Sequence, residues 1–374
     1  MRILSFIILA LWLMALVRTI VNLLLVPRLK REMPRETPLV SVIIPARDEA
    51  NIIGRTVRAM LAQTYPNLEV VVVNDRSVDA TGEILHAIDD ARLVVVSGEE
   101  PPAGWLGKPW ALHQGARRAR GELLLFVDAD VQYSPDAVAA AVARLERSGL
   151  AMTALFPRFE LHGFWEHIAM PNMAVFAFSL MPLWIGNRTR LRLMAAGGGP
   201  GNLVKRSEYE AAGGHEALKD AVVDDVALAR LIRRGGHGTE FVRADDGFVS
   251  LRMYHGAREI IDGFTKNMFS VFGRNYVAVT IILIVTLAGN VLPLVLALTG
   301  DRIAIATLVV TSLTRLILFA SLRYRLDNAI FGNVPMVLIW TFILLRSTWR
   351  TGIRRQLHWR GRTYDASGTR FGAD

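Results

Sequence analysis

The hydrophobic pattern between residues 39 and 147 predicts a parallel β-sheet covered by helices. Four short runs rich in Val, Ile and Leu are each followed by a segment with helical periodicity. The predicted strands are residues 39–45, 69–75, 92–97 and 122–128, and the predicted helices are residues 50–63, 81–87, 110–120 and 135–147. Apolar runs without alternation indicate strands buried on both faces, so we expect an α/β domain with a mixed, mainly parallel sheet and flanking helices.

Four longer apolar segments predict membrane helices towards both ends of the chain: residues 3–26, 277–298, 303–322 and 329–345. The first is too long for a typical signal-peptide core and lacks a small-residue cleavage site, so we expect an uncleaved transmembrane anchor. The last is short for a full crossing. Arg315, in the third segment, is costly in lipid, and we expect it to face a groove in the protein or to snorkel.

Basic residues predict the orientation of the chain in the membrane. Arg28, Lys30, Arg31 and Arg35 follow the first segment, whereas only Arg2 precedes it. The positive-inside rule therefore places residues 28–276 in the cytoplasm of a multi-pass inner-membrane protein. Three further crossings would leave an arginine-rich tail outside. Either residues 329–345 do not cross, or the tail breaks the rule, and we favour a cytoplasmic or interfacial tail.

Composition narrows the classes of partner. The 374 residues carry a formal net charge of +9, and 52% of them are hydrophobic, which is high for a soluble protein. The positive charge favours phosphorylated substrates or an anionic membrane. No nucleic-acid-binding motif accompanies it, so we expect no nucleic-acid partner. The absence of cysteine excludes disulfides and thiol catalysis.

Acidic residues follow three of the predicted strands. Glu49 lies just beyond the first strand, Asp75 ends the second, and Asp128 and Asp130 end the fourth. The carboxyl ends of parallel strands form the ligand-binding edge of such a sheet. Carboxylates gathered there favour a hard divalent cation shared with substrate phosphates. There is no GxxxxGK[ST] loop, and GGGPGN at residues 197–202 does not fit a dinucleotide fingerprint.

Four ordered stretches between residues 39 and 255 together resemble family 2 glycosyltransferases with the GT-A fold. VSVIIPARDEANI is similar to the opening strand and loop of that family, and VVVVNDRSVDAT to its nucleotide-binding stretch. GWLGKPWALHQGARRARGELLLFVDAD resembles the lysine-bearing segment followed by the Asp-X-Asp strand, and VVDDVALARLIRRGG resembles the acidic pair that opens a helix. HWRGRTY at residues 358–364 resembles the tails of smaller bacterial members that act on carotenoid- or hopanoid-type lipids, and the chain also resembles ceramide glucosyltransferase-like members.

The resemblance implies a role for each matching residue. Lys108 would contact the donor diphosphate, and Asp130 would bind Mn²⁺ or Mg²⁺ with help from Asp128, which also belongs to the donor site. Asp225 would be the general base, with Asp224 raising its proton affinity. The remaining donor-binding residues implied are Pro45, Arg47, Glu49, Asp75 and Asp79. Alternatively, Asp224 and Asp225 form only an acidic first turn that the helix dipole favours.

Two further features bear on the acceptor. Residues 163–187 are apolar and aromatic and lie between the predicted metal ligands and the predicted base. A single crossing there would separate the two halves of the site, so we expect this segment to lie in the membrane interface; an ordinary core helix is the alternative. His215 lies near the acceptor or has a packed or exposed role.

These observations predict an inverting, metal-dependent glycosyltransferase that moves one sugar from a nucleotide sugar, favoured as a UDP-sugar, to a hydroxyl of a membrane lipid. The alternatives are a processive polysaccharide synthase, which the missing Gln-X-X-Arg-Trp motif disfavours, and a non-catalytic membrane scaffold. The expected divisions are an anchor (residues 1–27), a cytoplasmic catalytic domain (36–256), an interfacial helix (257–276), membrane helices (277–345) and a basic tail (346–374).

Overall fold

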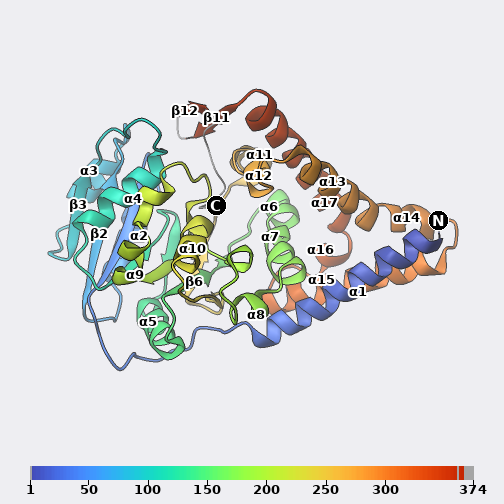
Figure 1. Cartoon of the computed structure of the whole chain (residues 1–374), viewed down its shortest axis with the longest axis horizontal. Coiled ribbons are helices and arrows are strands. Elements are labelled where there is room, and N and C mark those ends of the chain that lie inside the picture. Colours follow the sequence, from blue (N-terminus) through green and yellow to red (C-terminus); the bar gives the residue numbers. More distant parts are fainter. Residues whose placement is uncertain (1, 360–361, 366–374) are drawn as a thin grey trace. The chain divides into compact units, whose positions relative to one another are not determined.

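The computed structural model describes residues 2–359 and 362–365 and divides into two compact units (Figure 1). The described residues of unit 1 are 2–26, Leu161–Trp184, 254–359 and 362–365. The described residues of unit 2 are Pro27–Glu160 and Ile185–Met253. Part of the expected basic tail, residues 360–361 and 366–374, lies outside the described residues.

Unit 2 is built on a seven-stranded mixed sheet in the order β3-β2-β1-β4-β8-β6-β9. The first four strands in this order are parallel to one another, β8 is antiparallel to both of its neighbours, and β6 and β9 are parallel. The four predicted strands and the mainly parallel sheet are therefore confirmed. The strand bounds are β1 (Val40–Ala46), β2 (Leu68–Asn74), β3 (Leu93–Ser97), β4 (Leu123–Phe126), β6 (Met152–Phe156), β8 (Asn202–Lys205) and β9 (Thr239–Arg243).

A second, three-stranded sheet and several helices complete unit 2. The small sheet has the order β5-β10-β7. Its strands are β5 (Val131–Tyr133), β7 (Arg158–Phe159) and β10 (Val249–Leu251), and the α-helices are α2 (Ile53–Leu61), α3 (Thr81–His86), α4 (Gly107–Arg118), α5 (Ala137–Ser148), α9 (Arg206–Ala211) and α10 (Asp224–Arg234). Helices α2 to α5 confirm the four helices predicted between the strands.

Close packing of α4 on the sheet sets the position of its first turn. The Val and Ile side chains of β1 and β2 are almost completely buried. A Cβ on Gly115 of α4 would come within 2.5 Å of the Ile43 side chain and 3.1 Å of the Val73 side chain. Glycine at this position therefore lets α4 approach the sheet more closely than any other residue would. The same helix carries Lys108 in its first turn.

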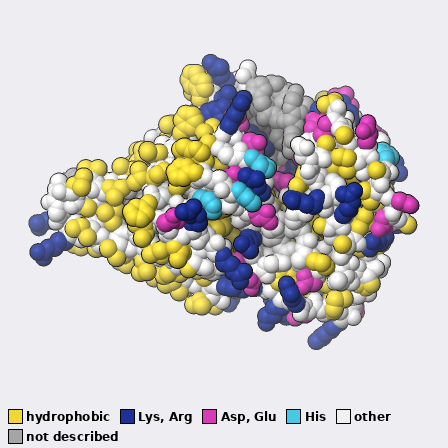
Figure 2. Space-filling view, turned by 180° about the vertical axis from the view of Figure 1, so that it is seen from behind, with side chains coloured by type: hydrophobic (Ala, Val, Ile, Leu, Met, Phe, Trp, Pro, Cys, Tyr) yellow, Lys and Arg dark blue, Asp and Glu magenta, His cyan; other side chains and the backbone are white. Residues whose placement is uncertain are grey.

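The described part of unit 1 contains three helices that are long and apolar enough to cross a membrane, judged by length and composition: Arg2–Leu25, Tyr276–Ala297 and Arg302–Leu322. The described helices of unit 1 are α1 (Arg2–Leu25), α6 (Phe164–Ala169), α7 (Pro171–Val175), α8 (Leu183–Gly186, ending in unit 2), α11 (Gly256–Thr265), α12 (Met268–Val271), α13 (Tyr276–Asn290), α14 (Leu292–Ala297), α15 (Arg302–Leu322), α16 (Asp327–Ile330) and α17 (Asn333–Ser347). Hydrophobic side chains gather on the surface over α1 and α13 to α15 (Figure 2). The fourth apolar segment forms α17, which is not one of the three candidates.

Helix α1 packs along α15 (Figure 1). Near its start, the Ser5 hydroxyl lies 3.4 Å from an Asp301 carboxylate oxygen, in the turn before α15. Near its end, Asn22 donates hydrogen bonds to the Phe178 and Met181 carbonyls at 2.8 and 2.7 Å. The segment around residue 180 therefore packs at the opposite end of α1 from Asp301.

The apolar segment 163–187 is not one continuous helix. It consists of α6, α7, a π-helical turn (Phe176–Leu180) and α8. The expected interfacial helix 257–276 is likewise divided, into α11 and α12, which are followed by the start of α13. In the first segment the backbone stays helical from α6 through the π-helical turn and leaves the helix at Met181, whose backbone is extended.

Arg315 is 1% exposed and is surrounded by protein. Its guanidinium donates hydrogen bonds to the Ala329 and Asn328 carbonyls at 3.0 and 2.9 Å. It also lies 5.0 Å from the Phe319 ring centroid. Of the two placements expected for this arginine, the groove in the protein is confirmed and the snorkelling position is wrong.

Candidate active site

The loops that follow β1 and β2 are hydrogen-bonded to each other at the carboxyl ends of these strands. The Asp48 N–H donates to the Ser77 hydroxyl at 3.1 Å, and an Asp48 carboxylate oxygen accepts from the Val78 N–H at 2.8 Å. Asp48 adopts a left-handed backbone (φ 53°), which Asp tolerates better than most residues. An Asp79 oxygen accepts from the Ala50 N–H at 3.0 Å, so this exposed acid links the same two loops.

Asp75 and Arg47 pair within these loops. Arg47 Nη1 donates to the Asp75 carbonyl at 2.9 Å and lies 3.8 Å from a carboxylate oxygen of the same residue. The Asp75 side chain is 3% exposed. Pro45 lies in β1 beyond its last partner in β4, where no hydrogen bond to that strand is lost. The donor-side residues predicted from the first two stretches are therefore clustered at one edge of the sheet.

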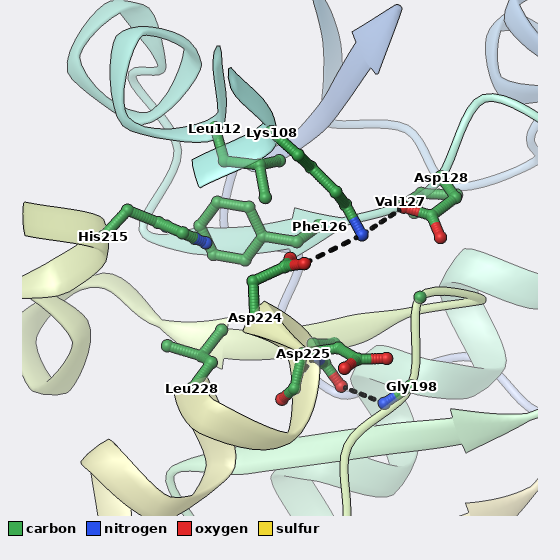
Figure 3. A pocket seen from close by; sticks show the side chains of 12 residues that line it. Lys108, Leu112, Phe126, Val127, Asp128, Gly198, His215, Asp224, Asp225 and Leu228 are labelled. Atoms are coloured by element: carbon green, nitrogen blue, oxygen red, sulfur yellow. Dashed lines mark hydrogen bonds and ion pairs between the residues drawn. The ribbon is translucent and has the colours of Figure 1, made fainter. Parts of the chain in front are cut away.

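Lys108 joins three elements in a separate, small pocket (Figure 3). Its Nζ lies 2.8 Å from Asp128 Oδ1, just after β4, and 3.1 Å from Asp224 Oδ1, in the first turn of α10. Burial alone would lower the pKa of Lys108, but Asp128, Asp224 and Asp225 outweigh burial and hold that pKa well above its usual range. One cation is thus shared by acids nearly a hundred residues apart in the sequence.

Asp225 lines the same pocket and is held beside the glycine-rich segment. Its own Oδ1 accepts from the Val226 N–H at 2.8 Å, and its backbone carbonyl accepts from the Asn202 side chain at 3.2 Å. The Asp128 N–H donates to the Gly199 carbonyl at 2.9 Å. Burial and the nearby Asp128 raise the pKa of Asp225, with Lys108 opposing them. Burial also raises the pKa of Asp224, which Asp225 and Asp128 raise further.

Asp130 lies in a region of excess negative charge. Burial, followed by Asp128 and Glu49, raises the pKa of Asp130 to about 7. Within the described part of the chain, no group of three His, Cys, Asp or Glu side chains is arranged to hold a metal ion. A cation at this site would therefore need further oxygen ligands from a bound molecule.

His215 is buried against the pocket, with its ring edge-on to Phe126. The Tyr209 hydroxyl accepts from the backbone N–H of His215 at 3.0 Å and lies 2.8 Å from Nδ1 of the same residue, within hydrogen-bond distance. Burial, with Lys108 and His113, lowers the pKa of His215 to about 3. The imidazole is therefore neutral, with one N–H donor and one acceptor nitrogen, and it lines the pocket.

We expect His215→Phe to lower turnover about tenfold, because it removes one hydrogen-bond donor while preserving bulk. His215→Gln is the matched variant, since its amide places an N–H at a similar reach. The measurement is kcat and KM at saturating donor, together with the unfolding temperature of each variant. If both variants lose the same fraction of kcat and both unfold at lower temperatures, His215 contributes only to packing.

The structure separates the predicted site residues into two neighbouring groups. Lys108, Asp128, Asp224 and Asp225 line one pocket. The others do not line it: Pro45, Arg47, Glu49, Asp75, Asp79 and Asp130. Asp130 connects the groups electrostatically, because both Asp128 and Glu49 act on it. Sequence reasoning gave no role to Gly198, Gly199 and Asn202 of the pocket lining, and it left His215 between a place near the acceptor and a packed or exposed one.

Residues 41–197, which include β1 to β7 and most of the residues above, match the family model described as glycosyl transferase family 2. This stretch is similar to the catalytic domain of that family. The resemblance seen in the sequence is therefore confirmed. The chain is 26% identical, over 341 residues, to the 4,4'-diaponeurosporenoate glycosyltransferase of Staphylococcus aureus, and the match covers 87% of this chain and 88% of that protein.

Solved structures of glycosyltransferases are also similar to this chain. One is a mannosyltransferase from Pyrobaculum calidifontis in complex with GDP-Man and Mn²⁺, at 20% identity and a TM-score of 0.49, covering 94% of this chain and 99% of that one. Another is S. aureus TarS 1–349 in complex with UDP-GlcNAc, at 16% identity and a TM-score of 0.44, covering 87% and 95%. Asp225 and His215 lie outside the stretch matched by the family model but share a pocket with Lys108 and Asp128 of that stretch.

Proposed function

We propose that this chain is an inverting, metal-dependent glycosyltransferase that moves a single sugar from a nucleotide sugar, preferentially a UDP-sugar, to a hydroxyl group of a membrane lipid. The observation that carries the proposal is the pocket in which Lys108 contacts both Asp128 and Asp224, with Asp225 beside them. A cation for a diphosphate and a buried acid for a hydroxyl proton then share one cavity, within a chain whose residues 41–197 match the family 2 glycosyltransferase model.

The donor would bind along the edge of the sheet. Glu49 and Asp75 are acceptor-only side chains in their ionised forms and suit a base N–H or ribose hydroxyls. Lys108 would turn from its acidic partners towards the diphosphate, where a compact ammonium group neutralises charge. Arg47 holds the Asp75 carbonyl and carboxylate, so it would orient the nucleoside contact rather than the reacting atoms.

The acids at the end of β4 fit a hard divalent cation. Asp128 and Asp130 offer oxygen ligands, and the excess negative charge around Asp130 would disfavour an anionic diphosphate without an added cation. We assign Asp130 and Asp128 as the residues that would hold Mn²⁺ or Mg²⁺. When bound, such an ion neutralises charge that develops on the departing nucleoside diphosphate.

Removal of divalent ions should abolish transfer. We expect a chelator to eliminate glycolipid formation by the purified, membrane-reconstituted protein, and added Mn²⁺ or Mg²⁺ to restore it. Asp130→Asn should weaken the response to added metal more than Glu122→Gln, which changes an exposed acid before β4. Full activity in the chelated protein would contradict the metal requirement.

Asp225 would act on the acceptor. Its raised proton affinity suits a group that takes a proton from a hydroxyl during attack. The acceptor oxygen forms a bond to the anomeric carbon, the bond from that carbon to the diphosphate oxygen breaks, and the hydroxyl proton passes to Asp225. One direct displacement inverts the anomeric configuration and requires no covalent intermediate.

The membrane topology is supported by unit 1. With three crossings and a cytoplasmic catalytic domain, the N-terminus and the 298–301 turn lie outside, and residues from 323 onward return to the cytoplasm. The contact between Ser5 and Asp301 agrees with this, since both would lie on the same side. The arginine-rich tail then obeys the positive-inside rule.

A hydrophobic acceptor agrees with several observations. The S. aureus relatives are named for a carotenoid acceptor, diaponeurosporenoate. Residues 163–184 pack with the membrane helices in unit 1, at the end of α1 that this topology assigns to the cytoplasmic side. We assign this segment to the membrane interface, where it would receive the lipid before transfer.

Mass spectrometry of lipids from cells with and without the protein tests this function. The expected result is a glycolipid, present only with the protein, that is heavier than its precursor by one sugar. A ladder of several sugars would instead support a processive synthase. An unchanged lipid profile despite verified expression would contradict both.

A further inference from the structure

A short surface loop in unit 2 alternates basic and apolar side chains. We call residues 188–193 (Arg188, Thr189, Arg190, Leu191, Arg192 and Leu193) the arginine–leucine loop. Leu191 is 57% exposed and Leu193 is 85% exposed. All three arginines of the loop are exposed as well. Single exposed leucines are common on protein surfaces, but two within three residues, flanked by arginines, form a small amphipathic surface.

The loop is fixed to the domain rather than free to fold its leucines inward. Arg233, which is 3% exposed, donates hydrogen bonds to the Leu191 carbonyl at 2.8 Å and to the Gly186 carbonyl at 2.9 Å. Asn187 exchanges two hydrogen bonds of 2.8 Å with the backbone of Phe241 in β9. The chain is thus held at Gly186, Asn187 and Leu191, while the Leu191 and Leu193 side chains remain exposed.

The loop lies close in sequence to the segment that packs with the membrane helices, which suggests the membrane as its partner. It begins four residues after Trp184, the last residue of the unit 1 segment that packs with the membrane helices. Arginine with leucine is the combination that suits a lipid interface, where guanidinium groups meet phosphates and leucines meet acyl chains.

We propose that the arginine–leucine loop binds the anionic surface of the membrane, with Leu191 and Leu193 inserted below the headgroups and the three arginines among the lipid phosphates. This rests on the membrane placement given under the proposed function. The loop runs into Gly197–Gly199, which border Asp225 and Asp128. A loop anchored in this way holds the reaction pocket of unit 2 close to the lipid from which an acceptor arrives.

The absence of cysteine permits a direct test in the full-length protein. Leu193→Cys, labelled with a nitroxide, is reconstituted into nanodiscs of phosphatidylcholine alone or mixed with phosphatidylglycerol. Accessibility to oxygen relative to a water-soluble nickel complex reports insertion. Val78→Cys is the matched aqueous control, since Val78 is 90% exposed in the same unit, and Ile284→Cys on α13, 61% exposed, is the lipid control.

We expect the oxygen-to-nickel ratio of labelled Leu193→Cys to exceed that of labelled Val78→Cys several-fold in anionic nanodiscs and to fall in neutral ones. Replacing Arg190 and Arg192 with Gln in the labelled protein should remove the difference between the two lipid compositions. If Ile284→Cys reports lipid while Leu193→Cys is as aqueous as Val78→Cys, the loop proposal is overturned and membrane placement stands. If Ile284→Cys is also aqueous, membrane placement itself fails. If labelled Leu193→Cys inserts equally into neutral and anionic nanodiscs, the loop does not recognise anionic lipid, and that part of the proposal is overturned.

Discussion

Replacing Asp225 with Asn is expected to lower glycosyl transfer by about 10²–10⁴-fold, the range that a general base typically contributes. The amide preserves the size of the side chain and can still accept the Val226 N–H at Oδ1. It can no longer take up a proton from the acceptor hydroxyl. The measurement is single-turnover transfer in the reconstituted protein at saturating donor.

The fold should survive this substitution. Asp225 is adjacent in sequence to Asp224 and shares the pocket with Asp128, and burial already disfavours its charged form. Removing one of three neighbouring negative charges relieves repulsion, so the unfolding temperature should stay the same or rise slightly. Donor binding should also remain, because Lys108 and Asp128, which are assigned to the donor, are unchanged.

A matched control separates catalysis from helix capping. Glu83 lies in the first turn of α3, as Asp225 does in α10, and is exposed to solvent. If the acidic pair only stabilises a helix N-terminus, Asp225→Asn and Glu83→Gln should have similarly small effects on activity. Full transfer activity in Asp225→Asn would exclude Asp225 as the general base and point to an acceptor that arrives already ionised.

The sheet could be predicted because its strands are buried on both faces. Runs such as Val70–Val73 then contain no polar alternation, and polar residues mark where each strand stops. These polar strand ends also placed Asp75, Asp128 and Asp130 at the same edge of the sheet. Hydropathy likewise located three helices long enough to cross a membrane.

The arrangement within the site could not be predicted in the same way. The contact of Lys108 with both Asp128 and Asp224 depends on how closely α4 approaches the sheet, which a Cβ at Gly115 would prevent. The His215 ring is oriented by its contact with Tyr209, a partner that its local sequence does not single out. Glycine has no side chain to show a chemical role, so the contacts of residues 197–199 appear only in three dimensions.

Alanine substitutions at Gly197, Gly198 and Gly199 should show what the contacts of each glycine contribute. A Cβ at Gly199 would lie 2.1 Å from Asp128 Oδ2. The Asp128 carboxylate can rotate away, so we expect little change in unfolding temperature. The rotation would, however, disrupt the 2.8 Å contact with Lys108 and displace the predicted metal ligand. Because misplacement of a reacting group by about 1 Å can cost 10²-fold, transfer by Gly199→Ala should fall by about that factor.

The neighbouring glycines supply the controls. A Cβ at Gly198 would meet nothing closer than the Pro200 side chain at 3.3 Å, so Gly198→Ala should retain nearly normal transfer and stability. A Cβ at Gly197 would lie 2.1 Å from the Asp225 carbonyl oxygen, a backbone atom that cannot rotate away. Gly197→Ala should therefore lower both the rate of transfer and the unfolding temperature. Unfolding temperature and single-turnover transfer, measured on all three variants, resolve the series. If Gly199→Ala behaves like Gly198→Ala, the position of Asp128 does not limit the reaction, and its assignment to the metal and donor site is wrong.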